Sequence, residues 1–423
     1  MSYFTGEILQ PPALRFDYSS VSAQHPNPRQ GLRTYGPYDS SILAKDKVAC
    51  AVIYPRSLEQ EKDILLNGMI RGSGQFSGFQ RLFRVPLDMV VEKVIQQETA
   101  QEVQRAAQSL AGDNPDLVFI VTSIRNETLY ASAKGELLGN GIPNQVVTAE
   151  KLRNPSQLQW TLENIALACY AKVGGTPWVV TSESAKRELV IGISRAQDRT
   201  KKFVVGFVTL FTQDADFLFW YSLAPKPIEW EQDEYVEGLA SLIVEAYNEY
   251  RRQQGEPESI TLHLCKRPGR FREVEAIERA VKEIGANIPY ALLHLNDDSN
   301  YRLFDVGNAT YVPQAGLKVE LSRRNALLLL DGRIGERRNR RGVPRVLDVS
   351  MDKRSTMDVS GFPRLVRQIN DFARVNWRGF NAQAIPVTLN YSYLIARLVV
   401  EIGADRWNSI VSAGRLRDKA WFL

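Results

Sequence analysis

Three consecutive strand-like runs in the second half of the chain limit the fold more than any other feature of this sequence. The runs ELVIGIS, KFVVGFVTLF and DFLFWYSL follow one another between Glu188 and Leu223, with no helical stretch between them. Strand-like runs that are separated only by short polar segments favour antiparallel pairing. A long amphipathic helix is expected next, from about Asp233 to Arg252.

Beyond this helix, strand-like and helical stretches alternate. The expected order is strand SITLHLC, helix Glu273 to Ile284, strand PYALLHL, short strands through NALLLL and RVLDVS, and helices near Pro363 to Val375 and Tyr393 to Ile402. Such alternation is typical of parallel strands joined by crossover helices. Three antiparallel strands extended by parallel strands predict a mixed sheet of the ribonuclease H type.

The first half of the chain has its own alternating pattern. Strands are expected at VACAVIY, at DLVFIVTS and near Gln145 to Thr148, and helices near Leu58 to Asn67, Ala100 to Ala111, Asn126 to Leu138 and Ser156 to Val173. This pattern predicts a separate α/β domain with a parallel sheet. The residues before it are rich in Pro, Ser and Gln, and GLRTYGPYD, Gly31 to Asp39, is expected to form a short strand and a turn.

Length and composition agree with two globular domains. A chain of 423 residues is too long for one ordinary core, and 44% hydrophobic with 24% charged residues is typical of soluble proteins. No apolar stretch reaches the roughly 20 residues that span a bilayer, so we expect a cytoplasmic protein without membrane association. The three cysteines are widely spaced and are expected to be reduced.

Positive charge is concentrated in one segment. The net charge is only +5, but eight arginines lie between Arg323 and Arg345 in a stretch punctuated by Gly and Pro. Such a loop can follow a phosphate backbone, or it can simply be a solvated loop that keeps the protein soluble. The candidates for backbone contacts here are Arg337, Arg338, Arg340 and Arg341.

Several segments, in this order, resemble the short prokaryotic Argonautes, which consist of a MID and a PIWI domain. These segments are GLRTYGPYD, LYASAKGELLGNGIPNQ at 129–145, AKVGGTPWVV at 171–180, ITLHLCKRPGRFRE at 260–273, NWRGF at 376–380 and the terminal WFL. The resemblance implies a lead-in at 1–39 that packs on PIWI, a MID domain with a Rossmann-like parallel sheet at 40–171, and a PIWI domain with the ribonuclease H-like sheet at 172–423.

The resemblance also implies a pocket for the 5′-phosphate of a guide nucleic acid. A terminal phosphate carries nearly two negative charges, so its site needs more than one cation together with neutral donors. Tyr130 and Lys134 lie four residues apart on one predicted helix face, and Gln145 and Lys172 match the family's remaining phosphate-binding positions. Taken singly, each of these residues could equally be an ordinary surface or helix-end residue.

Two arginines and the chain terminus complete the expected site. Arg125 could contact the phosphate or be solvated, and Arg378 is a candidate for backbone contacts. In the resembling proteins the C-terminal carboxylate helps to bind a Mg²⁺ or Mn²⁺ ion that bridges the guide phosphates; here that carboxylate belongs to Leu423. The apolar AWFL ending also favours a docked terminus on packing grounds alone.

The catalytic acids of this family are expected to be absent. Two-metal cleavage needs carboxylates that hold two ions at the scissile phosphate. Ser194, Pro268 and Tyr393 stand where active relatives carry Asp, Asp and His or Asp. We therefore expect a protein that is not a nuclease.

The resemblance implies a guide, with RNA favoured, that recognises a complementary target, with single-stranded DNA favoured, in prokaryotic defence. It further implies a separately encoded partner that replaces the N-terminal half and carries an effector. Two alternatives stay open at this point. One is an endonuclease with atypical acids such as Asp214 or Asp216, and the other is a PIWI-fold scaffold with a vestigial guide pocket.

Overall fold

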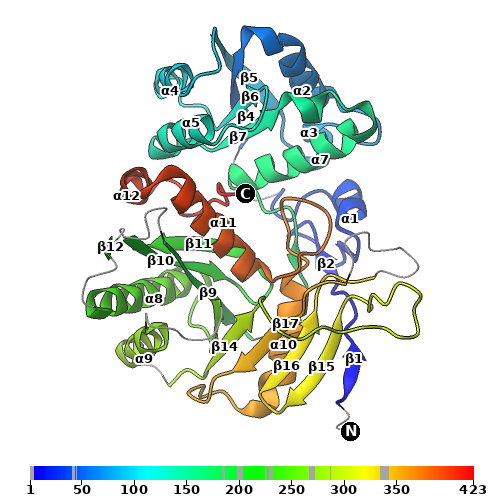
Figure 1. Cartoon of the computed structure of the whole chain (residues 1–423), viewed down its shortest axis with the longest axis vertical. Coiled ribbons are helices and arrows are strands. Elements are labelled where there is room, and N and C mark those ends of the chain that lie inside the picture. Colours follow the sequence, from blue (N-terminus) through cyan, green and yellow to red (C-terminus); the bar gives the residue numbers. More distant parts are fainter. Residues whose placement is uncertain are drawn as a thin grey trace.

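The computed structural model describes residues 4–40, 43, 45–182, 186–197, 203–223, 226–227, 232–265, 272–285, 287–333 and 343–423. Figure 1 shows two lobes: a smaller one whose colours run from blue through cyan to green, and a larger one that holds the dark-blue N-terminal segment and the part of the chain from green to red. The C-terminus lies where the two lobes meet, and the red helices of the larger lobe reach toward the smaller one.

A four-stranded parallel sheet forms the smaller lobe. Its order is β5 (Leu87–Ile95), β4 (Val48–Pro55), β6 (Leu117–Thr122) and β7 (Asn144–Thr148). Every residue of β6 is buried, as expected for a strand with helices on both faces. The helices around the sheet are α2 (Glu59–Arg71), α3 (Phe79–Phe83), α4 (Ala100–Ser109), α5 (Glu127–Gly139), α6 (Ala149–Leu152) and α7 (Pro155–Lys172). The predicted Rossmann-like parallel sheet is confirmed.

The large sheet of the second lobe combines antiparallel and parallel pairing. β9 (Glu188–Gln197), β10 (Phe203–Phe211) and β11 (Phe217–Ser222) are antiparallel, whereas β13 (Ser259–Cys265) and β14 (Tyr290–Asn296) run parallel to β9. Beyond β14 the sheet continues antiparallel through β17 (Leu347–Met351), β16 (Asn325–Leu329), β15 (Leu317–Ser322) and β1 (Gly6–Ile8), and β12 (Lys226–Pro227) pairs with β10. The predicted ribonuclease H-like sheet is confirmed.

Helices cover both faces of this sheet. On one face, α8 (Gln232–Gln254) and α9 (Glu273–Ile284) share a core with Leu189, Ile191 and Ile193 of β9. On the other face lie α10 (Phe362–Phe372) and α11 (Val387–Ile402), and α12 (Ala404–Ala413) follows. A Cβ atom at Gly192 would lie 2.7 Å from the Thr388 carbonyl oxygen. The glycine of VIGIS therefore lets α11 approach β9 closely.

The lead-in differs from its prediction. Pro28–Tyr35 forms helix α1, so the strand expected at the start of GLRTYGPYD is wrong. The Asn27 side chain accepts hydrogen bonds from the Arg29 and Gln30 amides, and Pro28 stands at the first helical position, where its missing N–H is tolerated. Short strands β2 (Leu14–Arg15), β3 (Gln24–His25) and β8 (Val179–Val180) form a third sheet beside it. The lead-in reaches the large sheet through β1; the domain bounds stay a prediction.

Candidate functional site

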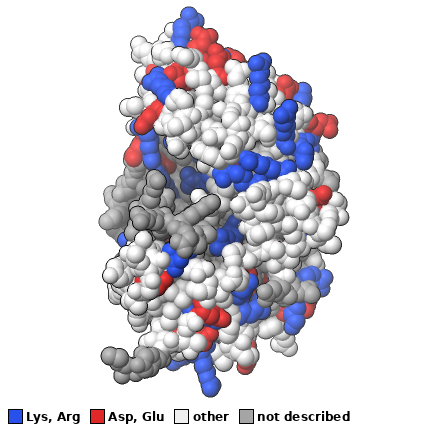
Figure 2. All heavy atoms as spheres, turned by 90° about the vertical axis from the view of Figure 1, so that its right-hand side faces the viewer, with Lys and Arg blue, Asp and Glu red and all other residues white. Residues whose placement is uncertain are grey.

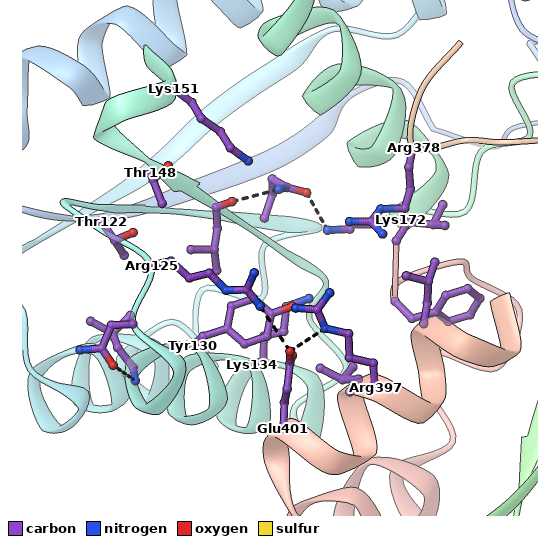
Figure 3. Close-up of a pocket in the computed structure, with 18 of the residues that line it drawn as sticks. Thr122, Arg125, Tyr130, Lys134, Thr148, Lys151, Lys172, Arg378, Arg397 and Glu401 are labelled. Carbon is purple, nitrogen blue, oxygen red and sulfur yellow. Dashed lines mark hydrogen bonds and ion pairs between the residues drawn. The ribbon is translucent and has the colours of Figure 1, made fainter. Parts of the chain in front are cut away.

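A pocket of about 410 Å³ opens between the two lobes. Its walls come from the carboxyl ends of β6 and β7, the first turns of α5, the end of α7, the helix α11 and the C-terminus (Figure 3). Parallel sheets commonly bind ligands outside the carboxyl ends of their strands. The lining includes Tyr130, Lys134, Gln145, Lys172 and Leu423, so the structure brings together all five residues of the predicted phosphate and metal site.

Lys172 lies at the inner end of the pocket, on the last turn of α7. It is 1% exposed, and its Nζ donates hydrogen bonds to the Gln145 side-chain oxygen at 2.7 Å and to the Asn144 carbonyl oxygen at 2.9 Å. Burial, together with the charges of Lys134 and Arg378, holds the pKa of this ammonium well below its usual value. Both hydrogen-bond acceptors are neutral. A negatively charged ligand at this position would therefore relieve an uncompensated buried charge.

Lys134 and Tyr130 lie side by side on α5. The Lys134 ammonium lies 5.0 Å from the centroid of the Tyr130 ring, within the range of cation–π attraction. Lys134 is 3% exposed and forms no ion pair with a carboxylate among the described residues. The phenol ring of Tyr130 lines the pocket and can offer a stacking face to a base.

Three arginines line the pocket: Arg378 beside Lys172, and Arg125 and Arg397 beside Glu401 (Figure 3). Arg125 comes from the loop before α5, and Arg397 comes from α11 of the other lobe. Glu401, one helical turn beyond Arg397, accepts a hydrogen bond from the Arg397 Nε at 2.8 Å and lies 3.6 Å from an Arg125 guanidinium nitrogen. Arg125 is thus within ion-pair distance of the second lobe, and its contact with a phosphate stays a prediction.

The chain terminus is docked at the edge of this pocket. Trp421 packs against Trp220 and Trp407, with ring centroids 5.5 and 6.1 Å away, and Phe422 packs against Tyr391 at 5.1 Å. Leu423 itself is 7% exposed and lines the pocket. The apolar ending therefore places Leu423 in the lining of the same pocket as Lys134 and Lys172. The role of the terminal carboxylate as a metal ligand stays a prediction.

Sequence reasoning missed several pocket residues, namely Thr122, Thr148, Lys151, Arg397 and Glu401. Thr122 and Thr148 end β6 and β7, so the rule for ligand binding at strand ends could have found them. Arg397 and Glu401 lie on a helix of the other lobe, and no local signal indicates which face of that helix meets the pocket.

The expected catalytic positions are only partly described. Ser194 is buried in β9 and pairs with Phe207 across the sheet. The Tyr393 hydroxyl lies 2.8 Å from the Cys265 Sγ and donates a hydrogen bond to Asp297 Oδ1 at 3.1 Å. Pro268 lies outside the described residues, as do Arg337, Arg338, Arg340 and Arg341 of the arginine-rich loop. Within the described ranges, no group of three His, Cys, Asp or Glu side chains is placed to hold a metal ion.

Asp214 and Asp216, the atypical acids considered above, lie away from these positions. They belong to the turn between β10 and β11, next to Phe211, which pairs with Val190 at the opposite end of β9 from Ser194. Asp214 accepts a hydrogen bond from the Ser182 amide, and Asp216 accepts one from the Thr176 hydroxyl. These acids therefore stabilise a turn and do not converge with Ser194.

A sequence profile described as Piwi domain matches residues 93–327, which is more than half of the chain. The chain belongs to the Piwi family. It is 26% identical to the "Protein argonaute" of Cereibacter sphaeroides over 93% of its own length and 56% of that protein. It is 24% identical to the "Piwi protein" of Archaeoglobus fulgidus over 93% of both chains. The resemblance to prokaryotic Argonautes is thereby confirmed.

Solved Argonaute structures have the same fold. Drosophila Piwi superposes with a TM-score of 0.74 at 17% identity, over 99% of this chain and 56% of that one. Clostridium butyricum Argonaute, bound to a guide DNA and a 19-mer target DNA, superposes with a TM-score of 0.76 at 16% identity, over 94% of this chain and 53% of that one. The Argonaute-like chain thus spans about half the length of these proteins and of the Cereibacter relative. None of its described helices is long and apolar enough to cross a bilayer.

Proposed function

We propose that this Argonaute-like protein binds a short guide nucleic acid by its 5′-phosphate. The observation that carries the proposal is the pair of buried ammonium groups, Lys134 and Lys172, which face one pocket without a carboxylate partner among the described residues. A terminal phosphate has up to two charges and three acceptor oxygens to offer them. An uncharged metabolite would leave both charges uncompensated.

Each predicted residue has a role in this proposal. Lys134 and Lys172 neutralise the terminal phosphate, and the Gln145 amide, which now donates to the Val146 carbonyl oxygen at 3.0 Å, can turn to donate to a phosphate oxygen. Tyr130 stacks on the first base. Arg378 contacts the phosphates that follow.

The guide is proposed to be RNA and its target single-stranded DNA. Base pairing would then supply sequence specificity, while the protein binds ends, backbone and helical shape. Figure 2 supports a backbone path, because Lys and Arg side chains gather along the hollow between the lobes on the face shown. The Clostridium butyricum protein is bound to DNA in both roles, so the choice of RNA for the guide is a separate point to test.

A Mg²⁺ or Mn²⁺ ion fits this site only together with the ligand. The Leu423 terminus is the one protein carboxylate proposed to bind the ion, and hard cations of this kind commonly combine one or two carboxylates with substrate phosphates. When bound, the ion would screen the repulsion between the terminal carboxylate and the guide phosphates.

Target recognition is proposed to occur without cleavage. Ser194 and Tyr393 cannot supply metal-binding carboxylates, and Tyr393 instead holds Cys265 and Asp297 together. The output would then come from a separately encoded effector protein, in prokaryotic defence. This partnership is what the resemblance to the short prokaryotic Argonautes implies.

The two alternatives make different predictions. An endonuclease would cleave a complementary target in the presence of Mn²⁺. A scaffold with a vestigial pocket would bind its protein partner but would not distinguish a phosphorylated guide from an unphosphorylated one.

The test is the affinity of the purified protein for one short RNA, with and without its 5′-phosphate, with Mg²⁺ or with EDTA. We expect the phosphate to tighten binding by tenfold or more, equal to about 1.4 kcal/mol, and Lys134→Ala to remove that gain. Lys47→Ala is a matched control, because Lys47 is an exposed lysine paired with Asp88 outside the pocket. Equal affinity for both RNAs, unchanged by Lys134→Ala, would refute the guide-binding proposal.

A further inference from the structure

The pocket has two zones that differ in how their cations are compensated. In the inner zone, Lys172 donates its hydrogen bonds to neutral oxygens, Lys134 lies over the Tyr130 ring, and neither forms an ion pair with a carboxylate among the described residues. In the outer zone, a single carboxylate oxygen, Oε1 of Glu401, holds both Arg397 and Arg125. Figure 3 shows Glu401 between the two guanidinium groups, with dashed lines to both.

Two arginines hold the Glu401 carboxylate in this position. Its side chain is 13% exposed, and it binds Arg397 of its own helix and Arg125 of the opposite lobe. Arg125, by contrast, is 64% exposed, and its contact with Glu401 is the longer of the two. Exposed ion pairs at such distances contribute little stability, so the Arg125 contact is readily exchanged.

We propose that Glu401 is an internal competitor for the backbone phosphates of the guide, a carboxylate that must release Arg125 and Arg397 before nucleic acid can take them. The inference rests on the proposed function, since it assigns the outer arginines to the phosphates next to the terminal one. Exchange of a carboxylate for a phosphodiester on the same arginines changes the charge balance little. Binding at the outer zone therefore adds little net affinity, and most of the affinity comes from the inner zone.

Two opposing effects determine how loss of the Glu401 charge changes the affinity for RNA. Glu401 also orients the arginines, and loss of that orientation would weaken binding. Its negative charge, however, repels every phosphate that enters the outer zone, and Coulomb repulsion at such short range outweighs the loss of one surface hydrogen bond. Glu401→Gln should therefore tighten RNA binding.

Salt dependence separates displacement from a general electrostatic effect. Two arginines whose charge is halved by the single Glu401 carboxylate release fewer counterions when a phosphate binds than the same arginines do in Glu401→Gln. The slope of log K against log salt should steepen by roughly 0.7 for each such contact on a single strand. A mononucleotide phosphate reaches only the inner zone, so its affinity should change much less than that of RNA.

The experiment measures the affinity of 5′-phosphorylated RNA, 5′-hydroxyl RNA and adenosine 5′-monophosphate over a series of salt concentrations. Glu401→Gln should tighten both RNAs about fivefold or more with a steeper slope. Glu150→Gln is the matched control, because Glu150 lines the same pocket and has no ion pair with Arg125 or Arg397. Unchanged or weaker RNA binding by Glu401→Gln, or an equal effect of the two variants on all three ligands, would overturn the proposal.

A double-mutant cycle covers the case in which Glu401→Gln alters folding. Arg397→Gln alone should weaken RNA binding less than threefold. In the Glu401→Gln protein the same substitution should remove most of the gain in RNA affinity that Glu401→Gln produces. Additive effects would also overturn the proposal. If the wild-type protein does not distinguish the 5′-phosphate, the proposed function fails; the salt slope on 5′-hydroxyl RNA still shows whether Glu401 competes with nucleic acid.

Discussion

The Lys172 ammonium and the Gln145 side-chain oxygen are 2.7 Å apart, so a neutral amide holds a buried cation. The pKa of Lys172 is well below its usual value, mainly because of burial and also because of Lys134 and Arg378. The charged form is therefore less favourable in the folded protein than in the unfolded chain. The buried charge of Lys172 therefore lowers the stability of the folded protein, and an anionic ligand can bind to it.

Lys172→Met should separate the effect of the buried charge on stability from its effect on phosphate binding. The folded protein no longer holds a buried charge, while the acceptors Asn144 and Gln145 lose one donor, so thermal unfolding should show stability unchanged or raised by about 1 kcal/mol. Affinity for 5′-phosphorylated RNA should fall at least tenfold, and affinity for 5′-hydroxyl RNA should fall much less. A strongly destabilised variant would show that Lys172 is mainly a structural residue.

The Asp39 and Asp216 carboxyls should make stability depend on pH. Asp39 accepts hydrogen bonds from the Tyr170 hydroxyl and the Thr176 amide, and the Thr176 hydroxyl donates to Asp216. Burial raises the pKa of Asp39 to about 6, and burial together with the Asp39 charge raises that of Asp216 to about 7. Because these folded-state pKa values exceed those of the unfolded chain, the folded protein binds protons more tightly. Stability should rise as the pH falls from about 7 toward about 4.

Asp216→Asn should remove part of this dependence. The amide oxygen can still accept from Thr176, and the repulsion with Asp39 is lost, so at pH 8 the variant should be more stable by about 1 to 3 kcal/mol. Urea denaturation at pH 6 and pH 8 measures the difference. Asp88→Asn, at an exposed carboxylate, should leave the pH dependence as it is. A variant whose pH dependence equals that of the wild type would contradict the assignment.

Much of the architecture could be predicted because both sheets are built from long apolar strands. β5 was missed since it alternates exposed and partly buried residues around Glu92 and Lys93, as edge strands do. Gly and Pro between Gly31 and Asp39 favour a short strand and a turn, whereas the Asn27 cap decides the helix α1. The inner pocket could be predicted by resemblance. Arg397 and Glu401 could not, because they join the site through the packing of α11 between the lobes.

Arg29 should be important for holding the lead-in to both lobes. Its guanidinium lies 4.7 Å from the ring of Trp160 in α7 and 4.6 Å from that of Phe380 near the pocket, and it pairs with Glu163 at 2.7 Å. The Glu163 side chain is 1% exposed, and among the described residues Arg33 is the ion-pair partner that remains when Arg29 is removed. Arg29→Ala should therefore destabilise the protein by about 2 to 4 kcal/mol.

Thermal unfolding checks this prediction. Arg29→Lys should recover part of the stability, since it restores the charge without the planar group that stacks between two rings. Arg105→Ala, at an exposed arginine of α4, is the control and should change stability by less than about 0.5 kcal/mol. Equal effects of Arg29→Ala and Arg105→Ala would show that the lead-in does not hold the lobes together.

Gly192→Ala should impair the pocket from a distance. An added Cβ would lie 2.6 Å from the Thr209 hydroxyl and 2.7 Å from the Thr388 carbonyl oxygen, which belongs to the backbone of α11 and cannot rotate away. The helix must then move off β9, at a cost of about 2 kcal/mol. Tyr391 of the same helix packs against Phe422 and so holds the chain terminus at the pocket. Phosphate-dependent RNA affinity should therefore fall together with stability. Gly112→Ala is the matched control, because a Cβ there meets no atom within 4 Å. If Gly192→Ala destabilises the protein but leaves the affinity unchanged, α11 positions its pocket residues independently of how closely it packs on the sheet.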